Sequence, residues 1–307
     1  MQKLAVIDCG TNTFHLLIVS LNQGTFTTEY RKQFPVKLGE GGINKGTIQA
    51  AAYERGINAL TFFGEKIKEF GADKVAAFAT SAIRSAANGA QFSAEVLDKT
   101  GIELATIDGL REAELIYNGV KHAYPLTDEN VLVMDIGGGS VEFILGNNEK
   151  IHWHGSFEVG AARLAEMFHT TEPISAGDLK ALNSFLEKHL APLREAVAKF
   201  PVTKLVGSAG SFDSICELVN ERFGTHLLEN NETWCNIPLE SYSQIHTILL
   251  LSTLEDRKKM AGLVDYRVEM MVVASCLIDY ALRANNLSEL FCSTYSLKEG
   301  VMFELLG

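Results

Sequence analysis

The sequence has no apolar run long enough to cross a lipid bilayer. Its longest apolar stretch, around residues 270–278, is far shorter than the roughly 20 residues that a spanning helix needs. The first residues are also unlike a signal peptide, because a single Lys precedes an apolar run that Asp8, Gly10 and Asn12 interrupt. We therefore expect a protein without a membrane partner.

Cysteine is scarce and scattered. The chain has five cysteines, an odd number, and no C-x-x-C pair occurs among them. This spacing argues against both a disulfide framework and a zinc site. We expect reduced, packed thiols and a cytoplasmic protein. The cysteines are Cys9, Cys216, Cys235, Cys276 and Cys292.

Basic residues are outnumbered. The 307 residues include 27 Lys and Arg against 38 Asp and Glu, which gives a formal net charge of −11. An acidic surface repels nucleic acids and anionic membranes, so we expect no nucleic-acid partner. A polyanionic ligand would need a locally basic cleft or bound cations.

The most informative pattern is a phrase that occurs twice. Residues 4–19 read LAVIDCGTNTFHLLIV and residues 131–145 read VLVMDIGGGSVEFIL. Each copy is an apolar run ending in Asp, a turn of Gly and small polar residues, and a second apolar run. Asp8 and Asp135 are about one domain's length apart. The pattern predicts two β-hairpins that face each other across a cleft and clamp one phosphate chain, with an Asp at each root to hold a cation.

The second turn suits phosphate and metal binding best. Gly137, Gly138 and Gly139 let the backbone approach a phosphate closely and reach positive φ, and Ser140 adds a hydroxyl donor. Asp135 and Glu142 are placed to hold Mg²⁺ directly or through its waters. The alternative is a tight hairpin whose glycines serve the turn geometry alone.

The first turn carries fewer glycines and more side-chain donors. Asp8 is followed by Gly10 and by Thr11, Asn12 and Thr13, whose hydroxyl and amide groups can donate to phosphate oxygens. The alternative is an Asx-type turn that satisfies its own backbone. We interpret this turn as the supporting clamp.

Strands and helices alternate along the rest of the chain. Helical patterns cover residues 47–70, 111–122, 178–199, 211–223, 240–254, 268–285 and 297–306, and Pro192 predicts a break in the third of these. Residues 25–39 predict one or two strands, and KVAAFAT, ELATID, TKLVGSAG and ELFCSTYS predict four more. With the internal duplication, this order predicts an α/β protein of two similar lobes. We expect one domain at residues 1–125, joined by a returning helix at 296–307, and a second at 126–295.

The ordered set of motifs resembles one known family. DCGTNTFHLL, ATSAIRSAANG, GLREAELIYNGV, DIGGGSVEF, GSAGS and LKEG occur in the order found in the exopolyphosphatase and guanosine-pentaphosphatase (Ppx/GppA) phosphatases. The resemblance covers residues 4–304 and implies two actin-like, ribonuclease H-like lobes with a cleft between them. Some relatives have an additional helical C-terminal region, so this chain resembles the short, two-domain form.

The resemblance implies roles for Glu112 and Arg84. Glu112 matches the catalytic base, which would deprotonate the attacking water. Arg84 follows a predicted helix N-terminus and matches a phosphate-binding position. We expect Asn88 to orient Arg84. Arg111 stands where the family often has an acidic residue, a change that would add a phosphate contact or lower the pKa of the base.

Further cations and hydroxyls follow later in the chain. Arg267 and Lys298 match basic positions of the family, although Lys298 replaces the usual Arg. Ser208, in GSAGS, is expected to face a phosphate, although a strand-to-helix turn explains it almost as well.

Together these residues predict hydrolysis of a terminal phosphoanhydride with Mg²⁺ or another divalent cation as cofactor. The resemblance implies inorganic polyphosphate or a guanosine penta- or tetraphosphate as ligand. Two alternatives stay open: a kinase of the same superfamily, and a regulatory protein that binds polyphosphate or (p)ppGpp with little turnover. The apolar faces of residues 245–254 and 268–282 leave a homodimer open as well.

Overall fold

The strands of the protein form two mixed sheets. The computed structural model describes residues 2–22, 25–229 and 232–306. The first sheet has the order β3-β2-β1-β4-β5, with bounds β1 Gln2–Cys9, β2 Phe14–Asn22, β3 Thr25–Phe34, β4 Lys74–Ala79 and β5 Leu104–Thr106. The second has the order β10-β11-β9-β6-β7-β8, with bounds β6 Val131–Ile136, β7 Val141–Gly146, β8 Ile151–Phe157, β9 Lys204–Ser208, β10 Trp234–Asn236 and β11 Glu289–Ser293.

The two sheets repeat one topology. β1, β2 and β3 form an antiparallel meander, to which β4 and β5 add in parallel. β6, β7 and β8 repeat the meander, β9 and β11 add in parallel, and β10 pairs antiparallel at the edge. The predicted α/β class with two similar lobes is therefore confirmed.

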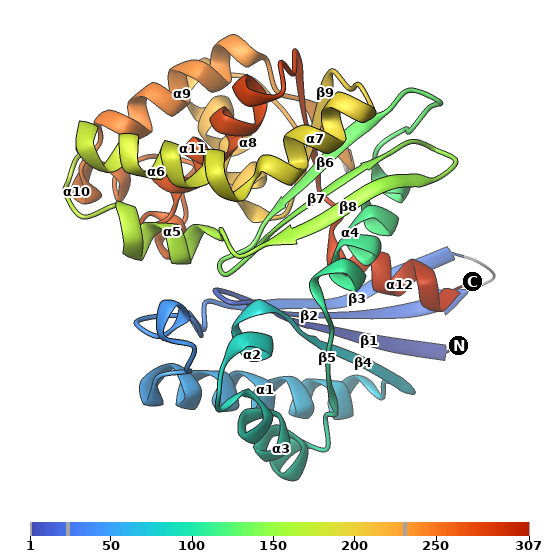
Figure 1. Ribbon diagram of the computed structural model, residues 1–307. Helices are drawn as coiled ribbons and strands as arrows, with labels where there is room; N and C mark the ends of the chain where they lie inside the picture. The colour runs from blue at the N-terminus through green and yellow to red at the C-terminus, as the bar shows by residue number, and fades with distance from the viewer. Residues whose placement is uncertain (1, 23–24, 230–231, 307) are drawn as a thin grey trace.

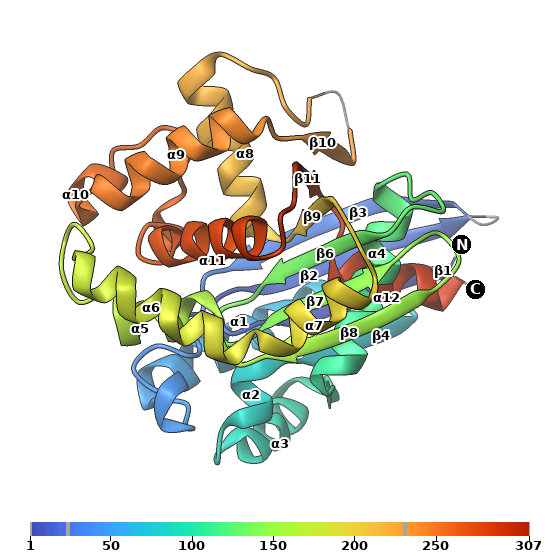
Figure 2. The same cartoon turned by 45° about the horizontal axis from the view of Figure 1, so that its top comes forward.

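Helices cover both outer faces and fill the space between the sheets (Figures 1 and 2). The first lobe, consisting of the first sheet and its outer helices, includes η1 Ile43–Lys45, α1 Ala50–Phe70, α2 Ser81–Ser85 and α3 Gly89–Thr100. The second lobe, defined in the same way, includes α5 Ala161–Phe168, α6 Ala176–His189, α7 Ala191–Lys199, α8 Gly210–Phe223, α9 Leu239–Leu251, α10 Leu254–Arg257, η2 Asp265–Arg267 and α11 Met271–Ala284. The middle layer is α4 Gly109–Ala123 and α12 Leu297–Leu306. Among the described residues, no helix is both long and apolar enough to cross a membrane.

The central strands are apolar on both faces because both faces are covered. In β1, Ala5 and Ile7 pack under α1 and α3, whereas Leu4 and Val6 pack against the middle layer. In β6, Leu132 belongs to the core of the second lobe and the neighbouring Val131 and Val133 to the middle layer. Three hydrophobic cores result, one under each outer helical layer and one between the sheets.

Most predicted elements are present with shifted ends. The helix predicted from residue 47 begins at Ala50, and the one predicted from residue 268 begins at Met271, after a 3₁₀ turn. The predicted break in residues 178–199 separates α6 from α7, where Pro192 lies at the start of the second helix. The predictions missed α5, β10 and the short α10. α4 packs on β6, β7 and β8 of the second sheet and α12 packs on β1 of the first, so the division at residue 125 stays a prediction.

The two helices of the middle layer cross at two glycines. A Cβ atom on Gly300 of α12 would lie 1.8 Å from the carbonyl oxygen of Leu115 in α4. A Cβ on Gly119 of α4 would lie 2.2 Å from the carbonyl oxygen of Ser296. Only glycine permits this approach, because the obstructing atoms are backbone atoms.

Gly300→Ala should therefore destabilise the protein. We expect a loss of about 2–3 kcal/mol in the free energy of unfolding, because the added methyl forces the two helices apart. Gly177→Ala in α6 is the control: its Cβ would lie 3.7 Å from the nearest atom, so alanine should be neutral or slightly stabilising. Urea denaturation of both variants measures the difference, and equal midpoints would contradict the close crossing.

Candidate active site

The two repeated turns meet at one cavity between the lobes. Side chains alternate along a strand, so Asp8 shares the inner face of β1 with Leu4 and Val6, and Asp135 shares that of β6 with Val131 and Val133. Both aspartates therefore point into the space between the sheets. There they line a cavity of about 450 Å³. Predicted residues on its wall are Asp8, Gly10, Thr11, Asn12, Thr13, Glu112, Asp135, Gly137, Gly138, Gly139, Ser140, Arg267 and Lys298.

The glycines of the turns are needed for close approach and not for positive φ. None of the four turn glycines has a left-handed backbone, so that part of the prediction is wrong. A Cβ on Gly138 would lie 3.0 Å from Cβ of Thr11, and one on Gly139 would lie 2.4 Å from Oγ of Ser81. The two turns thus touch each other, and larger residues would separate the lobes.

The start of α5 fixes the orientation of the second turn. The backbone N–H groups of Ala161 and Ala162 donate to the carbonyl oxygens of Gly137 and Gly138, at 2.9 Å each. In a planar trans peptide the following N–H points the opposite way. The N–H groups of Gly138 and Gly139 therefore point away from α5.

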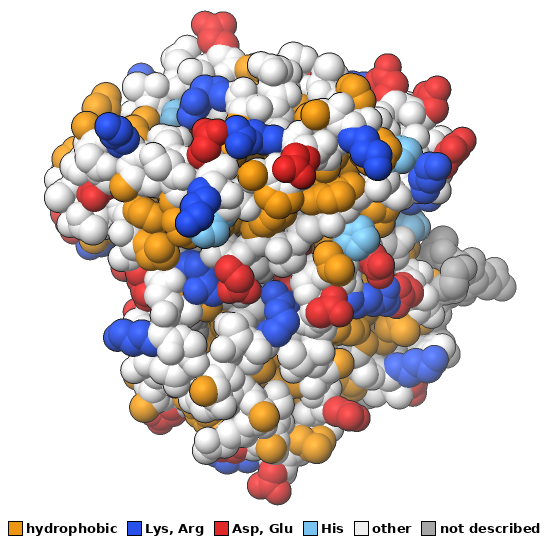
Figure 3. Space-filling model, in the orientation of Figure 1, with side chains coloured by type: hydrophobic (Ala, Val, Ile, Leu, Met, Phe, Trp, Pro, Cys, Tyr) orange, Lys and Arg blue, Asp and Glu red, His pale blue; other side chains and the backbone are white. Residues whose placement is uncertain are grey.

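Polar contacts also join the two lobes at residues that do not line the cavity. Lys37 Nζ lies 2.7 Å from Oε2 of Glu269, and the N–H of Gly41 donates to Oε1 of Glu166 at 2.8 Å. Asn44 Nδ2 donates to the other oxygen of Glu166 at 3.0 Å. Figure 3 shows acidic and basic side chains alternating along the line where the lobes meet.

Ser208 and Glu142 lie behind the cavity wall. Ser208 is fully buried, and its hydroxyl donates to Oδ2 of Asp135, so it orients that carboxylate without facing the cavity. Glu142 is 1% exposed and accepts hydrogen bonds from Ser140 and, at 2.7 Å, from Oγ of Ser156. Direct contact of Ser208 with a phosphate is therefore not supported, and a role for Glu142 through water stays a prediction.

The cavity gathers carboxylates whose ionisation is costly. Burial raises the pKa of Asp8 to about 7, while Lys298 lowers it and Asp135 adds to the rise. Burial also raises the pKa of Asp135, against the hydrogen bond from Ser208 and the charges of Lys298 and Arg267. These sites hold their protons more tightly than exposed carboxyls do.

Glu112 forms a buried ion pair with Arg84. It is 8% exposed near the start of α4, and Arg84 Nη1 donates to its Oε2 at 2.9 Å. The same nitrogen donates to the carbonyl oxygen of Ile107 at 3.0 Å. Burial raises the pKa of Glu112 to about 7, although Arg84 opposes the rise. Arg84 is held behind Glu112 and does not line the cavity, so a phosphate contact of Arg84 stays a prediction.

Two expectations around this pair are wrong. Arg111 points away from Glu112 and forms exposed ion pairs with Glu114 and Glu304, so it neither reaches the cavity nor lowers the pKa of the base. Asn88 does not contact Arg84. It accepts from the N–H of Ile48 and donates to the carbonyl oxygen of Ile48, at 2.9 Å each, and so anchors the loop before α1.

Arg267 and Lys298 supply the positive charge of the cavity. The guanidinium of Arg267 covers Gly210 so closely that a Cβ there would lie 1.4 Å from its Nη2. It also lies over the ring of Tyr266, with Cζ 5.4 Å from the centroid. Lys298 reaches from the start of α12, and Arg31 joins it on the wall.

Sequence reasoning missed several wall residues. His15 pairs with Asp8 across the β1–β2 hairpin, and burial and nearby cations hold its pKa well below the ordinary value. Asp213 and Glu217 line the cavity from α8, and burial raises the pKa of Asp213 to about 6. The alternation of side chains along β2 predicts that His15 points into the cavity, because His15 lies on the same inner face as Leu17. Ser81 is buried and its Oγ has no hydrogen-bond partner in the described structure.

The donor set fits a divalent cation shared with substrate phosphates. In residues 2–22, 25–229 and 232–306, no three His, Cys, Asp or Glu side chains converge to hold a metal alone. Asp8 and Asp135 nevertheless face one cavity and lie close enough to affect each other's ionisation. Mg²⁺ is commonly held by one or two carboxylates together with phosphate oxygens and waters.

Comparison with known proteins identifies relatives of the whole chain. The sequence profile of the Ppx/GppA phosphatase family matches residues 17–307. Exopolyphosphatase 1 of Mycobacterium bovis is 25% identical over 307 residues, covering 99% of this chain and 88% of that protein. The crystal structure of an exopolyphosphatase from Cytophaga hutchinsonii is 38% identical, with a TM-score of 0.96 and coverage of 99% and 98%. The Aquifex aeolicus PPX-GPPA enzyme shares the fold, at 24% identity, a TM-score of 0.81 and coverage of 99% of both chains.

Removing the charge of Glu112 should stabilise the protein at high pH. Its pKa of about 7 exceeds the ordinary value, so the folded state binds more protons than the unfolded state and stability falls as pH rises towards 7. Gln mimics the protonated form. We expect Glu112→Gln to be more stable by about 2 kcal/mol at pH 8, a few degrees in Tm, and the gain to vanish near pH 4.

Thermal unfolding in metal-free buffer across this range measures the effect. Glu114→Gln is the matched control, because Glu114 lies on the same helix and is exposed. A lower Tm of Glu112→Gln at pH 8 would show that the ion pair with Arg84 outweighs the cost of burial.

Gly210→Ala should displace Arg267. The methyl group would occupy the place of the guanidinium, so the cavity would lose a cation without losing the residue. We expect the affinity for inorganic tripolyphosphate to fall about tenfold, the scale of one charge-assisted hydrogen bond. Calorimetric titration measures the affinity, with Gly177→Ala as control. Unchanged affinity would show that Arg267 does not hold the anion.

Proposed function

Because this chain belongs to the Ppx/GppA phosphatase family, we propose that it hydrolyses the terminal phosphoanhydride bond of inorganic polyphosphate and releases orthophosphate. One observation carries the proposal. A buried carboxylate with a pKa near 7, Glu112, lines a cavity that two Gly-rich turns and two cations also line. The names of the relatives in Mycobacterium bovis and Cytophaga hutchinsonii support the same substrate class.

Glu112 would act as the general base. A carboxylate that titrates near neutral pH is basic enough to accept a proton from water and still ionised in part of the protein. Water would attack the terminal phosphorus, the bridging P–O bond would break, and Glu112 would take the proton. Arg84 holds Oε2 of Glu112 and so would leave Oε1 to face the water.

The turns and cations would hold the phosphate chain. Backbone N–H groups of Gly138 and Gly139, with the hydroxyls of Thr11 and Ser140, are suited to non-bridging phosphate oxygens. Lys298 and Arg267 would neutralise charge that builds up on the leaving chain. Both cations line the same cavity as the two aspartates.

Asp8 and Asp135 would hold the divalent cation, which supplies charge neutralisation and orientation of the phosphates when bound. The buried hydrogen bond from Ser208 orients Asp135 for this purpose. Glu142 would act through a water, since it is bound to Ser140 and Ser156.

A guanosine pentaphosphate is the second candidate substrate. The cavity wall also includes Leu228, Met270 and Met271, which offer an apolar surface to a nucleoside. We also propose a reducing, cytoplasmic setting, which the five free and buried cysteines suit.

Phosphate release is the test. We expect wild type to release orthophosphate from polyphosphate with Mg²⁺ and little without it, at a rate that rises with pH through about 7 as Glu112 loses its proton. Glu112→Gln should lower kcat by about 100-fold or more, because Gln cannot accept the proton of the attacking water. A parallel assay with pppGpp compares the two substrates.

Glu114→Gln, on the exposed side of α4, is the control and should keep wild-type activity. Binding of polyphosphate with no release by wild type would indicate a regulatory protein instead. Stabilisation by ATP and not by polyphosphate, with transfer to an acceptor, would indicate a kinase.

A further inference from the structure

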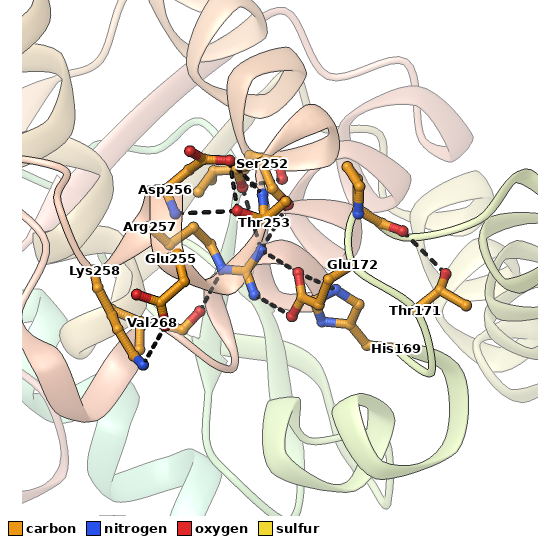
Figure 4. A network of polar contacts seen from close by, with 12 residues as sticks. His169, Thr171, Glu172, Ser252, Thr253, Glu255, Asp256, Arg257, Lys258 and Val268 are labelled. Carbon is orange, nitrogen blue, oxygen red and sulfur yellow. Dashed lines mark hydrogen bonds and ion pairs between the residues drawn. The ribbon is translucent and has the colours of Figure 1, made fainter.

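A fully buried arginine lies outside the cavity. Arg257, the last residue of α10, is 0% exposed, and burying a guanidinium is costly unless every donor is paired. Figure 4 shows how its partners surround it. Glu172 accepts from Nη1 at 3.0 Å and from Nη2 at 2.6 Å, a bidentate pair. Nε donates to the carbonyl oxygen of Val268 at 2.7 Å, and Nη1 to that of Ser252 at 3.0 Å.

These partners come from three separate segments. Glu172 lies in the connection between α5 and α6, Ser252 ends α9, and Val268 directly follows η2. His169, from the same connection as Glu172, lies with its Nε2 3.5 Å from Oε2 of Glu172. The hydrogen bond from Nε of Arg257 therefore holds the backbone at residue 268.

The backbone next to residue 268 carries Arg267, one of the cationic side chains of the cavity wall. Arg267 is the last residue of η2 and precedes Val268, whose carbonyl oxygen Arg257 binds. η2 also contacts the first lobe, because Asn12 Nδ2 donates to the carbonyl oxygen of Tyr266 at 3.4 Å and Gln33 Nε2 to its hydroxyl at 2.6 Å. The position of Arg267 is thus set from the second lobe by Arg257.

We propose that Arg257, held by Glu172, is a positioning residue that fixes Arg267 over Gly210 and so sets the affinity of the cavity for the phosphate chain. The inference rests on the proposed function, in which Arg267 binds phosphate. Arg257 itself does not line the cavity, so it acts through Arg267 alone. A purely structural arginine would instead affect stability and leave the affinity unchanged in a folded variant.

The test is a double-mutant cycle. Arg257→Met/Glu172→Met replaces the pair by apolar side chains, which is often neutral for stability, and removes the bond to Val268. We expect it to weaken binding of inorganic tripolyphosphate by about tenfold when Arg267 is present and by less than about twofold in an Arg267→Ala background. In the active enzyme KM should rise by the same factor, and kcat should fall as well because Arg267 would also neutralise charge on the leaving chain.

Two controls complete the design. Lys258→Ala removes a neighbouring exposed cation paired with Glu255 and should leave affinity unchanged. Glu172→Gln keeps the size of the side chain and weakens the bidentate pair, so it should give a smaller loss of affinity than the double replacement.

Hydrogen exchange of residues 264–270 gives a readout that needs no substrate. We expect faster exchange there in Arg257→Met/Glu172→Met than in wild type. Unchanged exchange, unchanged affinity, or an equal loss of affinity in the Arg267→Ala background would each overturn the inference. Failure of wild type to bind tripolyphosphate would instead count against the proposed function.

Discussion

The site depends on forcing like charges into one buried space. Side chains alternate between the two faces of β1 and β6, so Asp8 and Asp135 both point into the space between the sheets. Glu112 reaches the same cavity from the middle layer. Each carboxylate loses hydration there, and their mutual repulsion adds to the cost. Lys298 and Arg84 offset part of it. The fold therefore holds a site that a bound cation would stabilise, since it would offset the repulsion between the carboxylates.

Residues near both ends of the chain line this cavity. Lys298 comes from the start of α12, yet it lowers the pKa of Asp8, near the N-terminus. This proximity requires α12 to lie directly on α4, which the glycines at 119 and 300 permit. The middle layer is therefore both the packing element between the lobes and the source of Glu112 and Lys298.

The sequence was sufficient for features that depend on local period and turn chemistry. Such patterns predicted both hairpins, the Asp at the root of each, and the position of Glu112 near the start of a helix. The structure contains all three. Features that depend on tertiary contacts were missed. Arg84 was expected at a phosphate and pairs with Glu112, and nothing in the spacing of Asp213 or Arg257 indicates what they face. Which partner a long side chain reaches depends on which distant segments lie beside it in the fold, and a single sequence does not give that arrangement.

The two copies of the repeated phrase have diverged in what surrounds them. The second turn is bound from behind by the first turn of α5 and approached in front by Thr11 and Ser81, so its glycines are enclosed by backbone and side chains. The first turn is closed by a hydrogen bond from the N–H of Gly10 to the carbonyl oxygen of Thr13, and it is also bound from outside by the N–H groups of Lys37 and Gly39, which donate to the carbonyl oxygens of Asn12 and Thr11. A turn fixed from outside keeps its N–H groups in place when charge changes in front of it. Both turns are held in this way, and they differ in the donors that they carry: glycine N–H groups in the Asp135 turn, and the side chains of Thr11, Asn12 and Thr13 in the Asp8 turn.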